Sequence, residues 1–356
     1  MLAGGFVKQQ LKDGQNSDRI RQYWKLLREP CIMSHMRQWA GKLLILGFMA
    51  GAGFAFAQQA APSAAQIAQA EAQAQAYRAR NGLTPQLLQF MSEIARAKLQ
   101  LGQTAAAESY AQQTEQLCRQ ELAHRALDAE AQLPLALGAS IEIQAQAKAR
   151  NGDRSGALDL LRNALRQYGT TSLRARLQKN LNLLTLEGKP APTLVLTQHL
   201  GPKPPALDTL RGRPVLLFFW AHWCADCKHE EPIVGQLERE FGPKGLVLLG
   251  PTQRYGYAAY GEPASPQAEL QYIDGVRRQY YSELSDMPVP VSKLNFDRYG
   301  ASTTPTLVLI NRRGIVTLYH PGVLSYAQLR AEIEKVIAPD TAPGRRESQR
   351  AKTGRR

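Results

Sequence analysis

The sequence predicts an α/β domain over residues 189–338 that follows an all-α region over residues 76–186. In the second region, short apolar runs separated by longer mixed segments indicate alternating strands and helices. The first region is rich in Ala, Leu, Gln and Arg and poor in β-branched residues, which favours helices. At 356 residues with 44% hydrophobic content, the chain is long enough for two modest domains and terminal tails.

Four apolar runs in the second region predict the strands of a sheet. The first run, Pro214–Trp220, is followed by a segment with helical character, residues 228–241. The other strands are expected at 245–249, 307–310 and 315–319, and a further helix at 267–284. A Cys-x-x-Cys pair directly follows the first run, so it occupies a strand-to-helix turn.

This pair, Cys224 and Cys227, is suited to thiol–disulfide exchange. Cys224 is expected at the helix N-terminus, where unpaired N–H groups and the helix dipole favour a thiolate over a thiol. The spacing of three residues brings both sulfur atoms to one face of the helix. We therefore expect Cys224 to be an exposed attacking sulfur and Cys227 to resolve the mixed disulfide that forms.

Two other interpretations of the pair are weaker. A zinc site needs a second pair of ligands, and the remaining cysteines, Cys31 and Cys118, are isolated in the sequence. His222 and His229 flank the pair but do not form a second ligand pair. A purely structural disulfide across so short a loop would remove little entropy from the unfolded chain. We expect no metal and no organic cofactor.

Four segments of the second region resemble the thioredoxin-fold domains of the extracytoplasmic TlpA/ResA family. The segments, in the family's order, are Phe218–Cys227, Lys228–Pro232 with a proline inside the active-site helix, Tyr299–Thr306, and Asn311–Gly314. The resemblance implies a thioredoxin fold over residues 189–338, with a central mixed sheet flanked by helices. It also implies a thiol–disulfide oxidoreductase that acts on proteins carrying disulfides or thiols.

The resemblance assigns further site residues around the cysteine pair. It implies that the Thr304–Pro305 peptide bond is cis and that Pro305 faces the pair as part of the catalytic site. The backbone of Thr304 would then be free to pair with an extended substrate, and Trp223 would also contact substrate. From the residues alone, a proline at the start of a central strand lacks an N–H and restricts the preceding residue. An ordinary trans proline is the alternative.

An acidic residue near the pair is also implied. The buried Asp of thioredoxins corresponds here to Phe218, whereas the family's Glu three residues after the second cysteine corresponds to Glu230. A carboxylate there would raise the thiol pKa and carry a proton to or from Cys227. A solvated charge on the helix is the alternative. Asp226 also disfavours the thiolate, in opposition to the helix terminus.

The N-terminal residues predict export. Residues 1–35 are interpreted as an upstream extension, and residues 36–57 as a signal peptide with a short basic start. The apolar run Leu43–Ala57 is too short for a comfortable membrane span, and it ends in the cleavage pattern Ala55–Ala57. We expect a protein that is periplasmic or otherwise extracytoplasmic. An uncleaved membrane anchor formed by the same segment is the alternative.

The charge of the chain does not indicate a nucleic-acid partner. The net charge is +14, of which +5 lies in residues 1–42 and +4 in residues 340–356, leaving +5 for the rest. No basic helix with groove-reading side chains is recognisable. Residues 339–356 are expected to be a disordered basic tail.

The all-α region contains a weak internal repeat. Residues 58–75 are rich in Ala and Gln and are expected to be a linker. Leu101–Ala107 resembles Asn151–Ala157, and each places a glycine at a tight turn between helices. The pattern is typical of tetratricopeptide-like hairpins, although the spacing is 50 residues rather than 34. We expect this region to dock a protein partner, with a passive spacer as the alternative, and Cys118 to be a buried small hydrophobic residue.

These observations together favour an exported thiol–disulfide oxidoreductase that reduces protein disulfides. Its electrons would come from a membrane-borne thiol donor. A dithiol oxidase or isomerase is the alternative within the same chemistry. A helical-repeat scaffold with a vestigial thioredoxin domain is the alternative of another class, and the intact cysteine pair argues against it.

Overall fold

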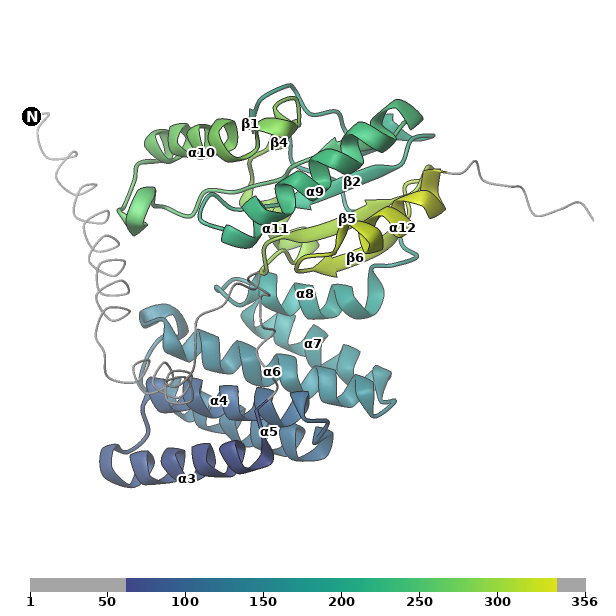
Figure 1. Cartoon of the computed structure of the whole chain (residues 1–356). Coiled ribbons are helices and arrows are strands. Elements are labelled where there is room, and N and C mark those ends of the chain that lie inside the picture. Colours follow the sequence, from purple (N-terminus) through teal and green to yellow (C-terminus); the bar gives the residue numbers. More distant parts are fainter. Residues whose placement is uncertain (1–61, 338–356) are drawn as a thin grey trace, which may run out of the picture. The chain divides into compact units, whose positions relative to one another are not determined.

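The computed structural model describes residues 62–337, which form two compact units (Figure 1). One unit comprises residues 62–184 with 254–274, and the other comprises 185–253 with 275–337. The predicted upstream extension, signal peptide and basic tail lie outside the described residues. Within residues 62–337, no helix is both long and apolar enough to cross a membrane.

The N-terminal segment of the first unit is built of six α-helices. They are α3 (Ala64–Asn81), α4 (Pro85–Gln100), α5 (Thr104–Glu121), α6 (Gln132–Arg150), α7 (Arg154–Tyr168) and α8 (Arg174–Thr185). Ser63 and Gln66 form a reciprocal capping box that starts α3. Part of the segment predicted as a linker, residues 58–75, is therefore helical from Ala64 onward.

The weak sequence repeat corresponds to the same turn used twice. Gly102 joins α4 to α5 and Gly152 joins α6 to α7, at φ of 76° and 85°. Glycine adopts this left-handed backbone without the steric cost that a side chain would add. Five residues later, Ala107 and Ala157 are fully buried, so the second helix of each pair packs closely. The turns are confirmed, whereas the tetratricopeptide assignment stays a prediction.

Buried polar residues of this unit are held by ion pairs. Glu142 on α6 accepts a hydrogen bond from Arg176 at 2.7 Å, and Lys179 and Arg96 lie within 3.5 Å of it. Burial alone would raise the pKa of Glu142, but these cations outweigh it and lower the pKa to about 2. Cys118 is a free, buried thiol whose pKa burial raises to about 12, as expected for a small core residue.

The second unit is built on a four-stranded mixed sheet with the order β3-β2-β5-β6. Its strands are β2 (Val215–Phe219), β3 (Val247–Leu249), β5 (Thr306–Ile310) and β6 (Val316–Pro321). β2 pairs with β3 in parallel and with β5 in antiparallel register, and β5 pairs with β6 in antiparallel register. Each of the four predicted strands thus matches an observed one. A separate pair, β1 (His199–Leu200) with β4 (Val289–Pro290), was not predicted.

Helices cover both faces of this sheet. They are α9 (Ala225–Phe241), α11 (Lys293–Tyr299) and α12 (Tyr326–Ile337), whereas α10 (Pro266–Tyr280) is divided between the two units. Alternate residues of β2, beginning with Val215, pack with Phe296 and Tyr299 of α11. α9 and α12 lie side by side over the sheet (Figure 1). The predicted helix over 267–284 corresponds to α10 followed by a short 3-10 turn, Ser282–Leu284.

We predict that Ala107→Leu destabilises the helical unit by about 1–3 kcal/mol, because extra methylene groups overpack a filled core. The matched control is Ala106→Leu, since Ala106 is exposed on the same helix. Chemical unfolding followed by helical circular dichroism would measure both. Equal stability of the two variants would show that α5 does not pack as closely as the structure indicates.

Candidate active site

Cys224 and Cys227 form a disulfide at the end of β2, where the chain enters α9. The sulfur atoms are 2.07 Å apart and the Cα atoms 5.3 Å apart. Cys224 is the N-cap residue of α9, and its Sγ accepts a hydrogen bond from the backbone N–H of Cys227 at 3.0 Å. The predicted strand-to-helix turn is therefore confirmed, with Cys224 at the helix N-terminus, where the helix dipole and free N–H groups favour negative charge.

The exposure of the two sulfurs differs from the expectation. Cys227 is 0% exposed, and Cys224 is only 3% exposed rather than an open nucleophile. The physical reason is the bond itself, because it ties the sulfur of Cys224 to a residue that lies wholly inside. The exposed group at this position is the neighbouring Trp223, at 50%.

Sheet pairing brings Pro305 to the same end of the molecule as the disulfide. β2 and β5 run antiparallel, with Phe219 opposite Thr306, so the end of β2 lies beside the start of β5. The Thr304–Pro305 peptide bond is cis, as the family resemblance implied. Pro305 is buried and its carbonyl accepts a hydrogen bond from the N–H of Gly322 at 2.8 Å.

The carboxyl group of Glu230 is buried beneath the active-site helix. Its residue is 2% exposed, and its Oε1 accepts a hydrogen bond from the N–H of Leu324 at 3.1 Å. Burial raises the pKa of Glu230 to about 7; the Leu324 N–H opposes this rise and the charge of Asp226 adds to it. The alternative of a solvated surface charge does not fit this environment. An acid with such a pKa can take up and release a proton near neutral pH.

A second buried acid, Glu231, was missed by the sequence reasoning. It is 6% exposed and accepts a hydrogen bond from the N–H of Glu283 at 3.0 Å, and burial raises its pKa. Tyr281, fully buried, packs on Trp220 with ring centroids 4.6 Å apart. The helical spacing of four residues from Cys227 was the signal that could have identified Glu231, because it places both on one helix face.

The position of the thioredoxin Asp is apolar in this chain. Phe218 is fully buried and packs against Tyr281, with ring centroids 6.2 Å apart. Buried carboxyl groups near the pair are instead carried by α9. In residues 62–337, no group of three or more His, Cys, Asp or Glu side chains is placed to hold a metal ion.

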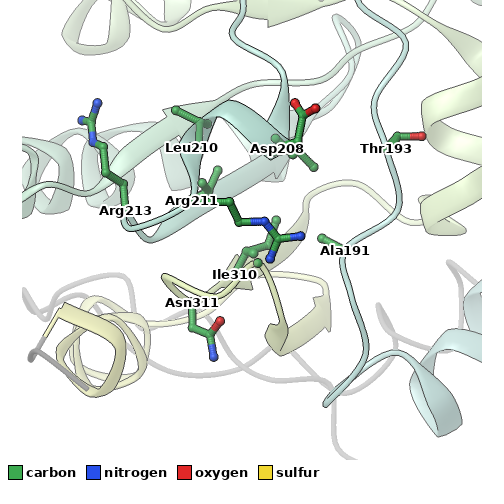
Figure 2. A pocket seen from close by; sticks show the side chains of 11 residues that line it. Ala191, Thr193, Asp208, Leu210, Arg211, Arg213, Ile310 and Asn311 are labelled. Carbon is green, nitrogen blue, oxygen red and sulfur yellow. The ribbon is translucent and has the colours of Figure 1, made fainter. Parts of the chain in front are cut away.

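A pocket in the same unit lies at the other end of the sheet (Figure 2). It is lined by Val215 and Ile310, which face each other at the start of β2 and the end of β5. The side chain of Arg211 extends into it beside Asn311. Because Phe219 and Thr306 mark the end that carries the disulfide, this pocket is separate from the cysteine pair.

The buried acid predicts a pH-dependent stability gain for Glu230→Gln. The ordinary pKa of this carboxyl is 4.5 and the folded value is about 7, so the folded chain binds the proton more tightly than the unfolded chain. The free energy of unfolding of the oxidised protein therefore falls as pH rises through this window. Gln keeps an acceptor for Leu324 without the charge, so it should add at most about 3 kcal/mol above pH 7.

This gain should disappear below about pH 4.5, where the carboxyl is protonated in both states. Chemical unfolding at pH 5 and pH 8 would measure it, with Glu238→Gln, on the same helix but partly exposed, as the matched control. A stability difference that is independent of pH would contradict the burial of an ionisable Glu230.

Comparison with known proteins connects this geometry to a family. The thioredoxin-like domain family matches residues 209–337. The DsbE thiol:disulfide interchange protein of Xylella fastidiosa is 29% identical over 164 residues, which cover 44% of this chain and 75% of DsbE. A solved structure of a putative DsbE from Chlorobium tepidum aligns with 42% of this chain and 97% of its own, at 23% identity and a TM-score of 0.33.

The thiol-disulfide oxidoreductase ResA of Bacillus cereus is more similar in sequence. It is 37% identical over 151 residues, which cover 42% of this chain and 78% of ResA. With this identity over most of ResA, and with a disulfide-bonded Cys-x-x-Cys at the helix N-terminus, the chain belongs to the thioredoxin-like family of thiol–disulfide oxidoreductases that includes ResA.

Proposed function

We propose that this protein is an exported oxidoreductase that reduces disulfide bonds in other proteins through Cys224 and Cys227. The observation that carries the proposal is the disulfide at the N-cap of α9, with a buried acid, Glu230, on the same helix. This combination supplies a nucleophile, a resolving thiol and a proton carrier within one short segment.

The reaction begins with the reduced pair. The Cys224 thiolate attacks a substrate disulfide, a mixed disulfide forms, and the other substrate sulfur leaves as a thiolate that takes a proton. Glu230 then accepts the proton of Cys227, and the Cys227 thiolate attacks the sulfur of Cys224. The second substrate sulfur leaves as a thiolate and takes the proton held by Glu230, and the first takes its proton from water. The substrate leaves as a dithiol and the protein as the Cys224–Cys227 disulfide, so two electrons have moved to the substrate.

The proposed roles of the two cysteines follow from their positions at the start of α9. Cys224 caps the helix and receives an N–H hydrogen bond, which stabilises its thiolate, whereas Cys227 is fully buried one turn further along. Glu230 lies three residues after Cys227 and therefore on the same helix face. Its pKa of about 7 suits it to exchange a proton with the resolving thiol.

The acidic surroundings favour the reducing direction. A thiol–disulfide protein becomes a strong oxidant when its reduced form is stabilised. Glu230 and Asp226 place negative charge near the pair and so destabilise a thiolate. The N-cap position of Cys224 acts the other way, and it is the observation that favours the second candidate, a dithiol oxidase or isomerase. The intact disulfide argues against a scaffold with a vestigial domain.

Substrate contacts are proposed on the exposed groups around the pair. Trp223 is half exposed beside Cys224, and Thr304 precedes the cis Pro305. Val323 is also exposed, and its neighbour Gly322 is hydrogen-bonded to Pro305. An extended substrate segment would pair with the Thr304 backbone and place apolar side chains against Trp223 and Val323.

The location and partners of the protein are part of the same proposal. The basic and apolar residues of 36–57 support export to an extracytoplasmic compartment, with a membrane anchor as the alternative. Electrons to restore the dithiol would come from a membrane-borne thiol donor. The helical unit, with its two similar hairpin turns, is proposed to dock a protein partner.

Trapping variants test the proposed chemistry. Cys224→Ser should reduce the rate of insulin disulfide reduction to that of buffer, because the first attack is lost. Cys227→Ser should keep the first attack but lose resolution, so a disulfide-bearing substrate stays covalently attached to Cys224. Non-reducing gels and mass spectrometry would detect the adduct, which should dissolve with reductant and persist when Cys118→Ser is added as the control.

Two results would count against this assignment. If Cys224→Ser captures substrate and Cys227→Ser does not, the roles of the two cysteines are reversed. If neither variant captures substrate and the unmodified protein does not reduce insulin, the redox function is wrong and the scaffold alternative is favoured.

Export is tested by the N-terminus of the mature protein. Because the apolar run is short and ends in Ala55–Ala57, we predict cleavage before Gln58 and recovery of the protein outside the cytoplasm. N-terminal sequencing of the purified native protein measures this directly. A membrane-bound protein that retains Leu43–Ala57 would support the anchor instead.

A further inference from the structure

We propose that His320 is a positioning residue for Glu230, acting through the loop that joins β6 to α12. This inference rests on the proposed role of Glu230 as the proton carrier for Cys227. His320 lies near the end of β6 and does not touch the disulfide in any contact that the structure shows. Its influence is assigned through the hydrogen bonds of one short loop, residues 322–325.

Three hydrogen bonds hold the first part of this loop, residues 322–324. The N–H of Leu324 donates to Glu230 Oε1 at 3.1 Å, and the N–H of Gly322 donates to the carbonyl of Pro305 at 2.8 Å. Between these two bonds, Nε2 of His320 lies 3.2 Å from the carbonyl oxygen of Val323. A carbonyl oxygen only accepts, so Nε2 must carry the proton and donate it. The His320 bond therefore holds the loop at the residue directly before the donor to Glu230.

The other end of the loop is fixed by α12 and α9. Ser325 and Gln328 bond to each other through backbone and side chains and so define where α12 begins. Tyr326 and Arg330, at the start of α12, bind the carboxylate of Glu240 at 2.7 and 2.8 Å. Because Glu240 is on α9, as Glu230 is, the helix that carries the acid also anchors the segment that donates to it.

The Leu324 N–H lowers the pKa of Glu230, against the larger effect of burial. A hydrogen bond donated to a carboxylate favours the ionised form, and it opposes the effect of burial here. Asp226, on the same helix, is the charged group that acts on Glu230, and residues 321–324 of the loop carry no charged side chain. Loosening the loop weakens this one favourable contact. Glu230 should then hold its proton to a higher pH.

The loop contains a sharp backbone turn at Gly322. Gly322 has a φ of 112°, a conformation that residues with a side chain rarely adopt. The chain therefore turns sharply at Gly322, and the His320 bond to Val323 spans that turn from β6 to the far side. Loss of the ring removes the side-chain contact that the structure shows across the turn.

The direct test is a carbon-13 NMR titration of the side-chain carboxyl groups in the oxidised full-length protein. The Glu230 signal is identified as the one that is absent from the spectrum of the Glu230→Gln variant. We expect a midpoint near pH 7 in the unmodified protein. His320→Ala should raise it by about one pH unit, a shift of the size expected when a hydrogen bond to a charged group is weakened.

Two further variants separate positioning from general damage. His320→Gln should restore the midpoint, because its amide can donate to the Val323 carbonyl. His199→Ala is the matched control, since His199 is an exposed histidine on β1, and it should leave the midpoint unchanged. An unchanged midpoint in His320→Ala, or an equal shift in His199→Ala, would overturn the inference.

A kinetic measurement distinguishes this inference from the proposed function. The rate at which Cys227 displaces a thionitrobenzoate group from Cys224 is followed against pH in His320→Ala, Glu230→Gln and the double variant. We expect His320→Ala to move the pH profile of this rate upward by as much as it moves the NMR midpoint of Glu230. In the Glu230→Gln background, His320→Ala should have no such effect. An equal change in both backgrounds would overturn the inference alone. If Glu230→Gln leaves the profile unchanged, the proposed role of Glu230 fails and the inference fails with it.

Discussion

The antiparallel pairing of β2 with β5 is the constraint on which the candidate site depends. It places Phe219 opposite Thr306, so the turn that carries Cys224 and the cis bond before Pro305 meet at one end of the sheet. Eighty residues of chain separate these two segments, and the register of the two central strands brings them to the same end of the sheet. Every residue of both strands is buried, so a slip by one position would turn core side chains to the other face.

The buried acids of this chain are at different positions from the buried Asp of thioredoxins. Phe218 makes the position before the motif apolar, and the buried carboxyl groups Glu230 and Glu231 lie on α9 instead. Burial of a carboxyl group costs stability when it is ionised, and the Leu324 N–H is the hydrogen bond that offsets this cost for Glu230. The proton affinity of Glu230, three residues after Cys227, therefore depends on a loop 94 residues further along the chain. Stability and the proton affinity of Glu230 are linked through the same hydrogen bond.

Features encoded locally could be predicted, and those that depend on distant pairing could not. The turn that carries Cys224 follows from an apolar run and a helix that are adjacent in sequence, and the positive φ at Gly102 and Gly152 follows from the need for a tight turn. The cis bond at Pro305 required the family resemblance, because base rates favour trans. The hydrogen-bond donor to the buried Glu230 is Leu324, 94 residues away, so the environment of this acid has no local sequence signal. The β1–β4 pair is two residues long on each side, too short to leave a periodic signal.

The reduction potential of the Cys224–Cys227 couple decides whether this protein is suited to reduce or to oxidise other proteins. The protein would be equilibrated with defined ratios of a reduced and oxidised dithiol, and the fraction of disulfide measured after the free thiols are trapped. With the proposed effect of Glu230 and Asp226 on the thiolate, the couple should be reducing, near the value of about −270 mV that thioredoxin has. A potential near about −120 mV, as in a strong dithiol oxidase, would contradict this expectation.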